Sequence, residues 1–201
     1  MTFEKGIKML LVSSYPPREC GLATFSNDIV NAVGLVFGNT LPIEVCALEN
    51  NNHQFTYNDE VKYTLAASCL EEYRQVAEKI NERNDIGLVC IQHEFGLFRG
   101  EYGDYILSFI LALNKPIVTV FHTVLPNPDE KRKKIVHAIA DLSDRIIVLT
   151  KNSQTILTTN YSVEKTKTIV IPHGNHNVLW EQKNILKNIY GFSDKIVMST
   201  F

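Results

Sequence analysis

Three histidines of this sequence each come directly after, or two residues after, a short apolar stretch. His93 follows residues 86–91, His122 follows residues 117–121, and His173 follows residues 168–171. If these stretches are parallel strands of one sheet, their carboxyl ends share an edge, where such sheets bind ligands. Neutral imidazoles there can donate hydrogen bonds to the hydroxyls of a sugar or to phosphate oxygens. The spacing therefore predicts a ligand site at this edge.

The same histidines, together with Glu94, are also residue types that bind zinc. The sequence has no His-Glu-x-x-His helix and no tight pair of ligands, so the zinc signal is weak. A metal-dependent hydrolase built on His93, His122 and His173 is an alternative to sugar or phosphate recognition. A serine hydrolase is disfavoured, because no Gly-x-Ser-x-Gly motif is present.

The loop after the first apolar stretch suits an approaching phosphate. Pro16 and Pro17 end the stretch, and Gly21 stands at the start of a helical pattern. A glycine there lets the backbone come close to a ligand, and the free N–H groups of a helix start attract phosphate. An ordinary strand-to-helix turn is the alternative, since neither a Gly-x-Gly-x-x-Gly fingerprint nor a Walker loop is present.

Strand and helix patterns alternate along the chain and predict the scaffold that positions these residues. Helical periodicity covers residues 21–36, 69–84 and 102–113. The alternation predicts an α/β fold: a Rossmann-like, mostly parallel sheet with helices on both faces. The predicted strands are residues 7–13, 43–48, 61–65, 86–91, 117–121, 145–149 and 168–171.

Composition narrows the functional classes. The 201 residues are 45% hydrophobic and 21% charged, which is ordinary for a globular protein and excludes a disordered or coiled-coil chain. A net charge of -2 argues against a nucleic-acid partner. No apolar run approaches the ~18 residues of a membrane span, and the N-terminus lacks a signal-peptide pattern, so we expect a cytoplasmic protein.

Two further features have simple explanations. The four cysteines are widely spaced, and Cys46 and Cys90 lie in apolar runs, so we expect buried thiols rather than disulfides. The basic residues 131–134 open a helix and are expected to form a solvated face. Contact with anionic lipid at the inner membrane face is the alternative for this basic run.

Four segments of the chain resemble the N-terminal half of the retaining glycosyltransferases of family 4, which have the GT-B fold. The segments occur in the family's order, and each follows a predicted strand. The resemblance spans essentially the whole chain. The segments are residues 15–25 (YPPRECGLATF), 92–96 (QHEFG), 120–123 (VFHT) and 171–174 (IPHG).

The resemblance implies one of two facing Rossmann-like domains. Residues 1–180 would form the N-terminal, acceptor-side domain. Residues 181–201 would form a linker helix, at 184–190, and the start of a C-terminal donor-binding domain whose first strand begins near residue 195. The implied activity of the full-length enzyme is hexosyl transfer from a nucleoside-diphosphate sugar to an acceptor hydroxyl with retention of configuration. Residues 1–201 alone are expected to be inactive.

The resemblance also implies residue roles. His122 would lie beside the reacting sugar as the catalytic residue, and the Gly21 N–H would approach the donor diphosphate. His93, Glu94 and His173 would line the acceptor side. No cofactor and no metal are implied. The implied partners are a nucleotide-sugar donor and a sugar or glycolipid acceptor of cell-envelope polysaccharide synthesis. A non-catalytic module that binds a nucleotide or a sugar phosphate is a further alternative.

Overall fold

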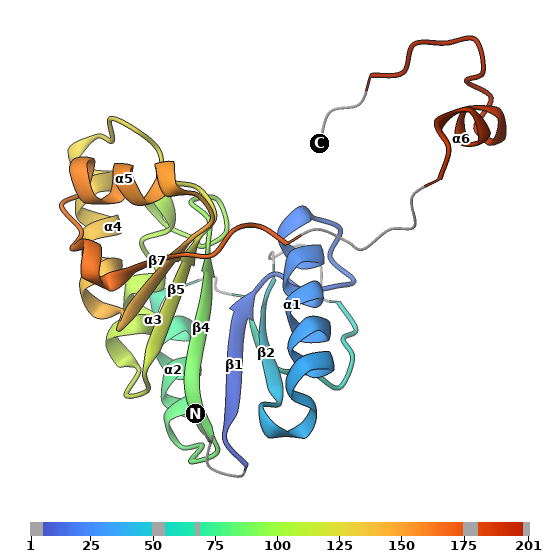
Figure 1. Cartoon of the computed structure of the whole chain (residues 1–201). Coiled ribbons are helices and arrows are strands. Elements are labelled where there is room, and N and C mark those ends of the chain that lie inside the picture. Colours follow the sequence, from blue (N-terminus) through green and yellow to red (C-terminus); the bar gives the residue numbers. More distant parts are fainter. Residues whose placement is uncertain (1–5, 50–54, 67–68, 175–180, 199–201) are drawn as a thin grey trace.

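A seven-stranded parallel sheet forms the centre of the protein in the computed structural model, which describes residues 6–49, 55–66, 69–174 and 181–198. The strands lie in the order β3-β2-β1-β4-β5-β6-β7 (Figure 1). The chain builds outward from β1 to β3, then crosses to the other side of β1 and builds outward to β7. The order therefore reverses between β1 and β4. The strands are β1 (Lys8–Ser13), β2 (Ile43–Leu48), β3 (Val61–Leu65), β4 (Ile86–His93), β5 (Ile117–Phe121), β6 (Arg145–Val148) and β7 (Thr168–Val170).

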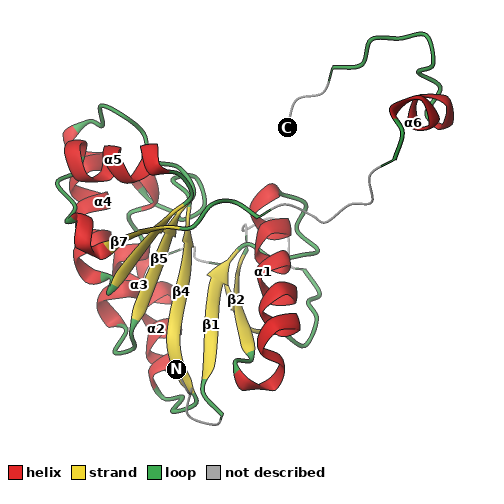
Figure 2. Ribbon diagram, viewed as in Figure 1, coloured by secondary structure: helices red, strands yellow, loops and turns green. Residues whose placement is uncertain are grey.

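Helices cover both faces of the sheet, but unequally (Figure 2). One face packs against four helices, and Leu10 of β1, Phe109 and Ile139 are buried in this larger core. The opposite face packs against α1 (Gly21–Phe37) and has a smaller core around Leu11 and Val45. The α/β prediction with helices on both faces is confirmed. The four helices of the larger core are α2 (Leu70–Asn81), α3 (Ile106–Ala112), α4 (Glu130–Leu142) and α5 (Lys151–Asn160).

Several boundaries differ from the sequence expectation. The helix expected over residues 102–113 is split into a 3-10 turn (Glu101–Gly103) and α3, because Tyr102 has a φ of 56°, outside the helical region. The expected linker helix is α6 (Lys183–Ile189), which has no buried residue and lies away from the sheet (Figure 1). The described residues 191–198 contain no strand, and residues 199–201 lie outside the described part. Two more 3-10 turns are Gly38–Thr40 and Lys165–Lys167.

Two further expectations from the sequence concerned buried thiols and the absence of a membrane span. Cys46 and Cys90 are buried free thiols as expected, Cys20 is partly exposed, and Cys69 is exposed, so not every thiol is buried. Within the described ranges, no helix has both the length and the apolar character required to cross a bilayer.

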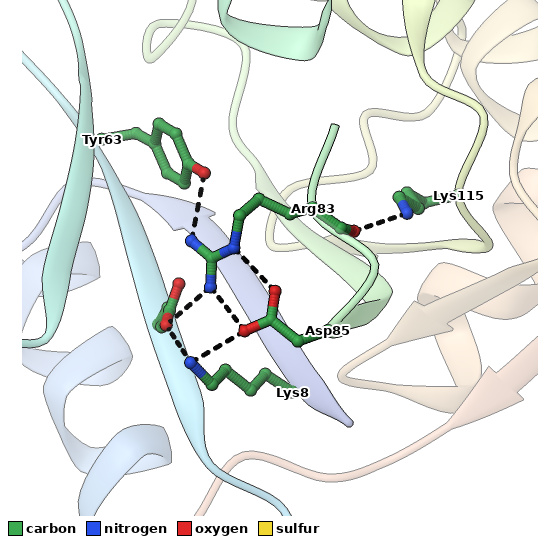
Figure 3. A network of polar contacts seen from close by, with 6 residues as sticks. Lys8, Tyr63, Arg83, Asp85 and Lys115 are labelled. Carbon is green, nitrogen blue, oxygen red and sulfur yellow. Dashed lines mark hydrogen bonds and ion pairs between the residues drawn. The ribbon is translucent and has the colours of Figure 1, made fainter. Parts of the chain in front are cut away.

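A charged cluster joins β1, β2 and the turn before β4 at the amino-terminal edge of the sheet (Figure 3). The nearly buried carboxylate of Glu44 accepts hydrogen bonds from Lys8 Nζ at 2.7 Å and from Arg83 Nη2 at 3.1 Å. Arg83 also donates two hydrogen bonds to Asp85, at 2.6 and 2.7 Å. Burial alone would raise the pKa of Glu44, but the hydrogen bonds from Lys8 and Arg83 lower it. Each charge thus has an opposite partner.

We expect Arg83→Ala to lower the free energy of unfolding by about 1–3 kcal/mol, because Asp85 loses its two hydrogen bonds from the guanidinium and the nearly buried Glu44 carboxylate loses one of its two. Arg74→Ala is the matched control, since Arg74 also contacts two carboxylates, Glu71 and Glu78, but on the exposed face of α2. It should leave stability nearly unchanged. Urea unfolding of both variants measures the difference, and equal losses would contradict a structural role specific to Arg83.

Candidate functional site

A cavity of about 200 Å³ lies at the carboxyl-terminal edge of the sheet, where the strand order reverses. One wall comes from the loop after β1 and the start of α1, and the other from the loop after β4. A hollow of about 180 Å³ between β3 and α2 contains none of the residues singled out in the sequence. The first cavity is therefore the candidate ligand site. It is lined by Ser14, Arg18, Cys20, Leu22, Glu94, Gly96 and Leu97.

The wall from the first loop carries the positive end of α1. Gly21 is the first residue of this helix, and a Cβ built on it would meet no atom within 4 Å, so the space beside its backbone is open. Cys20 caps the helix, because its Sγ accepts from Ala23 N at 3.4 Å. Arg18 adds a cationic side chain to the cavity wall. A helix start and a guanidinium at one cavity favour an anionic group there.

The opposite wall carries the carboxylate of Glu94, which is held in place by two hydrogen bonds. Its Oε2 accepts from Thr123 Oγ1 at 2.6 Å, and its Oε1 accepts from Phe95 N at 3.1 Å. The first bond joins the end of β4 to the loop after β5. An ionised carboxylate still has free acceptor capacity, so Glu94 can accept from a ligand hydroxyl.

His122 lies directly after β5, on the face of the sheet that α1 covers. Its Nε2 is 2.7 Å from the Oε1 of Gln92, and its ring centre is 4.8 Å from that of Phe25 on α1. Burial and, to a smaller extent, the charge of His173 lower the pKa of His122 to about 4. His122 is therefore neutral at pH 7. His173, which is exposed, contacts the same Phe25 ring at 4.7 Å.

His93 does not face the cavity, which corrects the expectation that its side chain contacts the acceptor. β4 extends two residues beyond the predicted strand, so His93 is its last residue and alternation turns the ring into the larger core. The ring is fully buried, with its centre 4.8 Å from Phe121, 5.4 Å from Phe95 and 5.9 Å from Phe98. Neither ring nitrogen has a hydrogen-bond partner among the described residues. Burial lowers the pKa of His93 to about 3.

The three histidines do not form a metal site. His93 lies in the core, whereas His173 lies at the surface. In the described parts of the chain, no three His, Cys, Asp or Glu side chains are grouped so that they could hold a metal ion. The structure therefore gives no support to the metal-dependent hydrolase.

The basic run has a role that the sequence analysis missed. The Arg132 guanidinium lies 4.2 Å from the ring centre of Tyr102 and 5.4 Å from that of Phe95, and Lys131 pairs with Glu101. These contacts attach α4 to the loop after β4, which carries Glu94. Part of the run thus stabilises a wall of the site rather than forming only a solvated face.

Sequence reasoning also missed four residues of the site: Phe25, Gln92, Thr123 and Arg18. Gln92 and Thr123 lie beside residues that were singled out, and strand alternation could have indicated that Gln92 and His93 point to opposite faces. Arg18 belongs to the loop that the prolines marked. Phe25 follows Gly21 by four residues, so both lie on one side of α1.

Comparison with known proteins supports the fold. No family model matches the sequence, and the search of curated proteins finds no match. Among solved structures, the chain is similar to a glycosyltransferase from Rickettsia africae ESF-5, with a TM-score of 0.60 and 13% sequence identity. The similarity covers 92% of this chain and 50% of that structure, so the chain spans about half its length. The shared feature is the Rossmann-like α/β architecture.

We expect acid to destabilise the protein partly through His93. Between pH 7 and pH 5 the unfolded chain, with a His pKa of 6.5, binds a proton that folded His93, with a pKa of about 3, does not bind. Stability therefore decreases with falling pH, by about 2 kcal/mol from this residue. His93→Leu should reduce the difference between urea unfolding at pH 7 and at pH 5 by that amount.

The matched control is Phe121→Leu, which removes part of the aromatic packing around His93 but no titratable group. It should lower stability by similar amounts at both pH values. A His93→Leu variant whose pH dependence equals that of the wild type would contradict the assignment of a buried, neutral His93.

Proposed function

We propose that residues 1–180 form the acceptor-side domain of a glycosyltransferase with two facing Rossmann-like domains. Residues 181–201 would contain the linker helix and the start of the donor-binding domain. The observation that carries the proposal is the cavity at the strand-order reversal. One wall has a helix start and Arg18, and the other has the fixed carboxylate of Glu94. This combination suits a diphosphate beside a sugar with free hydroxyls. The similarity in fold to a glycosyltransferase from Rickettsia africae ESF-5, over about half of that structure, supports the glycosyltransferase part of the proposal.

The proposed reaction is transfer of a hexose from a nucleoside-diphosphate sugar to an acceptor hydroxyl with retention of configuration. The bond from the anomeric carbon to the diphosphate oxygen breaks, and a bond from that carbon to the acceptor oxygen forms on the same face. The leaving phosphate oxygen takes the acceptor proton. The reaction needs no covalent enzyme intermediate, so the protein acts by positioning and by stabilising charge.

The residues divide between the two ends of the donor. The Gly21 N–H and Arg18 would stabilise the leaving diphosphate, since they provide the hydrogen-bond donors and the positive charge of the cavity. His122 would bind a hydroxyl of the reacting sugar, and Glu94 and His173 would contribute to the acceptor side. A sugar or glycolipid acceptor, a cytoplasmic location and a place in cell-envelope polysaccharide synthesis complete the proposal.

In the full-length polypeptide that contains this sequence, His122→Ala should lower the transfer rate by about 10²–10³, the effect of losing one preorganised polar group. Release of nucleoside diphosphate from a panel of nucleotide sugars measures the rate. His137→Ala on the exposed face of α4 is the control and should retain full activity. Near wild-type turnover by His122→Ala would remove His122 from the mechanism.

Gly21→Leu tests the close approach of a diphosphate to the helix start. A Cβ at this position meets no atom within 4 Å, so the variant should fold normally but bind a nucleoside diphosphate at least tenfold more weakly. Gly34→Leu is the matched control, because Gly34 lies on the same helix with equally open surroundings. Calorimetric titration of the full-length protein compares the two. Equal affinities would contradict the role of Gly21.

A further inference from the structure

The hydrogen bond between Gln92 and His122 indicates which nitrogen of the His122 ring carries the proton. Gln92 is fully buried near the end of β4, with its Oε1 2.7 Å from His122 Nε2 and its Nε2 3.5 Å from Cys90 Sγ. The strands pair in parallel with Gln92 opposite Val120, so His122 is the next residue on the same face of β5. The sheet register therefore aligns the two side chains.

The atoms of this bond define which ring nitrogen carries the proton. A neutral imidazole has one N–H and one lone-pair nitrogen, and a carbonyl oxygen only accepts. With the Gln92 oxygen facing Nε2, the proton lies on Nε2 and the lone pair on Nδ1. The amide nitrogen faces the Cys90 sulfur, and a thiol sulfur is a weak acceptor for it. Burial raises the pKa of Cys90 to about 12, so no thiolate competes for a proton.

The surroundings of His122 also favour the neutral ring. The titratable groups whose charge acts on the pair of histidines are basic: His173 acts on His122, and His122 acts on His93. Positive charge on His173 disfavours an imidazolium at His122. In the described part of the chain, no hydrogen bond is made to Nδ1 of His122, so this atom is available to a ligand.

We propose that Gln92 is a positioning residue that holds His122 as the Nε2–H tautomer, so that Nδ1 accepts a hydrogen bond from a sugar hydroxyl. The identity of that hydroxyl rests on the proposed function. The tautomer does not, because it follows from the protein's own contacts. The inference reverses the expectation from the sequence that neutral histidines at this edge act as donors.

The proposed tautomer predicts which chemical groups of a ligand can bind beside His122. A phosphate oxygen has no proton to give, and it is repelled by the lone pair of Nδ1. The position beside His122 therefore selects a hydroxyl and rejects an anion. The diphosphate is confined to the Gly21 and Arg18 side of the site, which has donors and positive charge.

Nitrogen-15 NMR of histidine-labelled protein tests the tautomer directly. At pH 7 the long-range spectrum should show a protonated Nε2 and an unprotonated Nδ1 for His122, assigned by the signals lost in His122→Ala. A protonated Nδ1 would overturn the proposal. Because this readout needs no activity, failure of the proposed glycosyltransferase function would leave it unaffected.

The variant Gln92→Glu provides a second test, the pKa of His122. A purely structural role of Gln92 would leave this pKa unchanged. A carboxylate opposite Nε2 favours the imidazolium, so the pH at which His122 titrates should rise by at least one unit. The acidic limb of the transfer rate should move to higher pH by the same amount, because a protonated Nδ1 cannot accept. Gln75→Glu, which adds the same charge on the exposed face of α2, should change neither. An unshifted His122 titration in a folded Gln92→Glu variant would contradict the proposal.

Discussion

Parallel pairing of β1 with both β2 and β4 is the constraint on which the site depends. The chain moves from β1 toward β2 on one side and from β4 toward β5 on the other, so right-handed crossovers carry the segments that leave β1 and β4 to opposite faces of the sheet. Side chains from two distant parts of the sequence therefore form the two walls of one cavity. The helix start supplies positive charge to one wall and a carboxylate supplies negative charge to the other.

The end of β4 shows how a strand distributes three consecutive polar residues. Gln92 faces the α1 side and contacts His122, whereas His93 faces the larger core and its ring lies against three phenylalanine rings. Glu94 follows the strand and is held toward the cavity by Thr123. One short segment thus holds His122, completes the core and lines the cavity, and these tasks differ in the direction of each side chain.

The sequence was sufficient for the strands and their parallel direction, because continuous apolar runs and the residues that follow them are local signals. It was insufficient for His93, since two extra residues of β4 changed a loop position into a core position. It also could not indicate that Arg132 packs on Tyr102, a residue of a distant loop whose backbone is left-handed. Contacts between distant segments, such as Phe25 with His173, have no signature in a single sequence.

The ionic cluster of Lys8, Glu44, Arg83 and Asp85 lies at the edge of the sheet opposite the cavity. The charges that join these strands therefore share no residue with the lining of the cavity. Evolution, or a protein engineer, can exchange residues around the cavity while the anchoring charges keep the sheet folded. Such a division of labour makes the architecture easy to diversify.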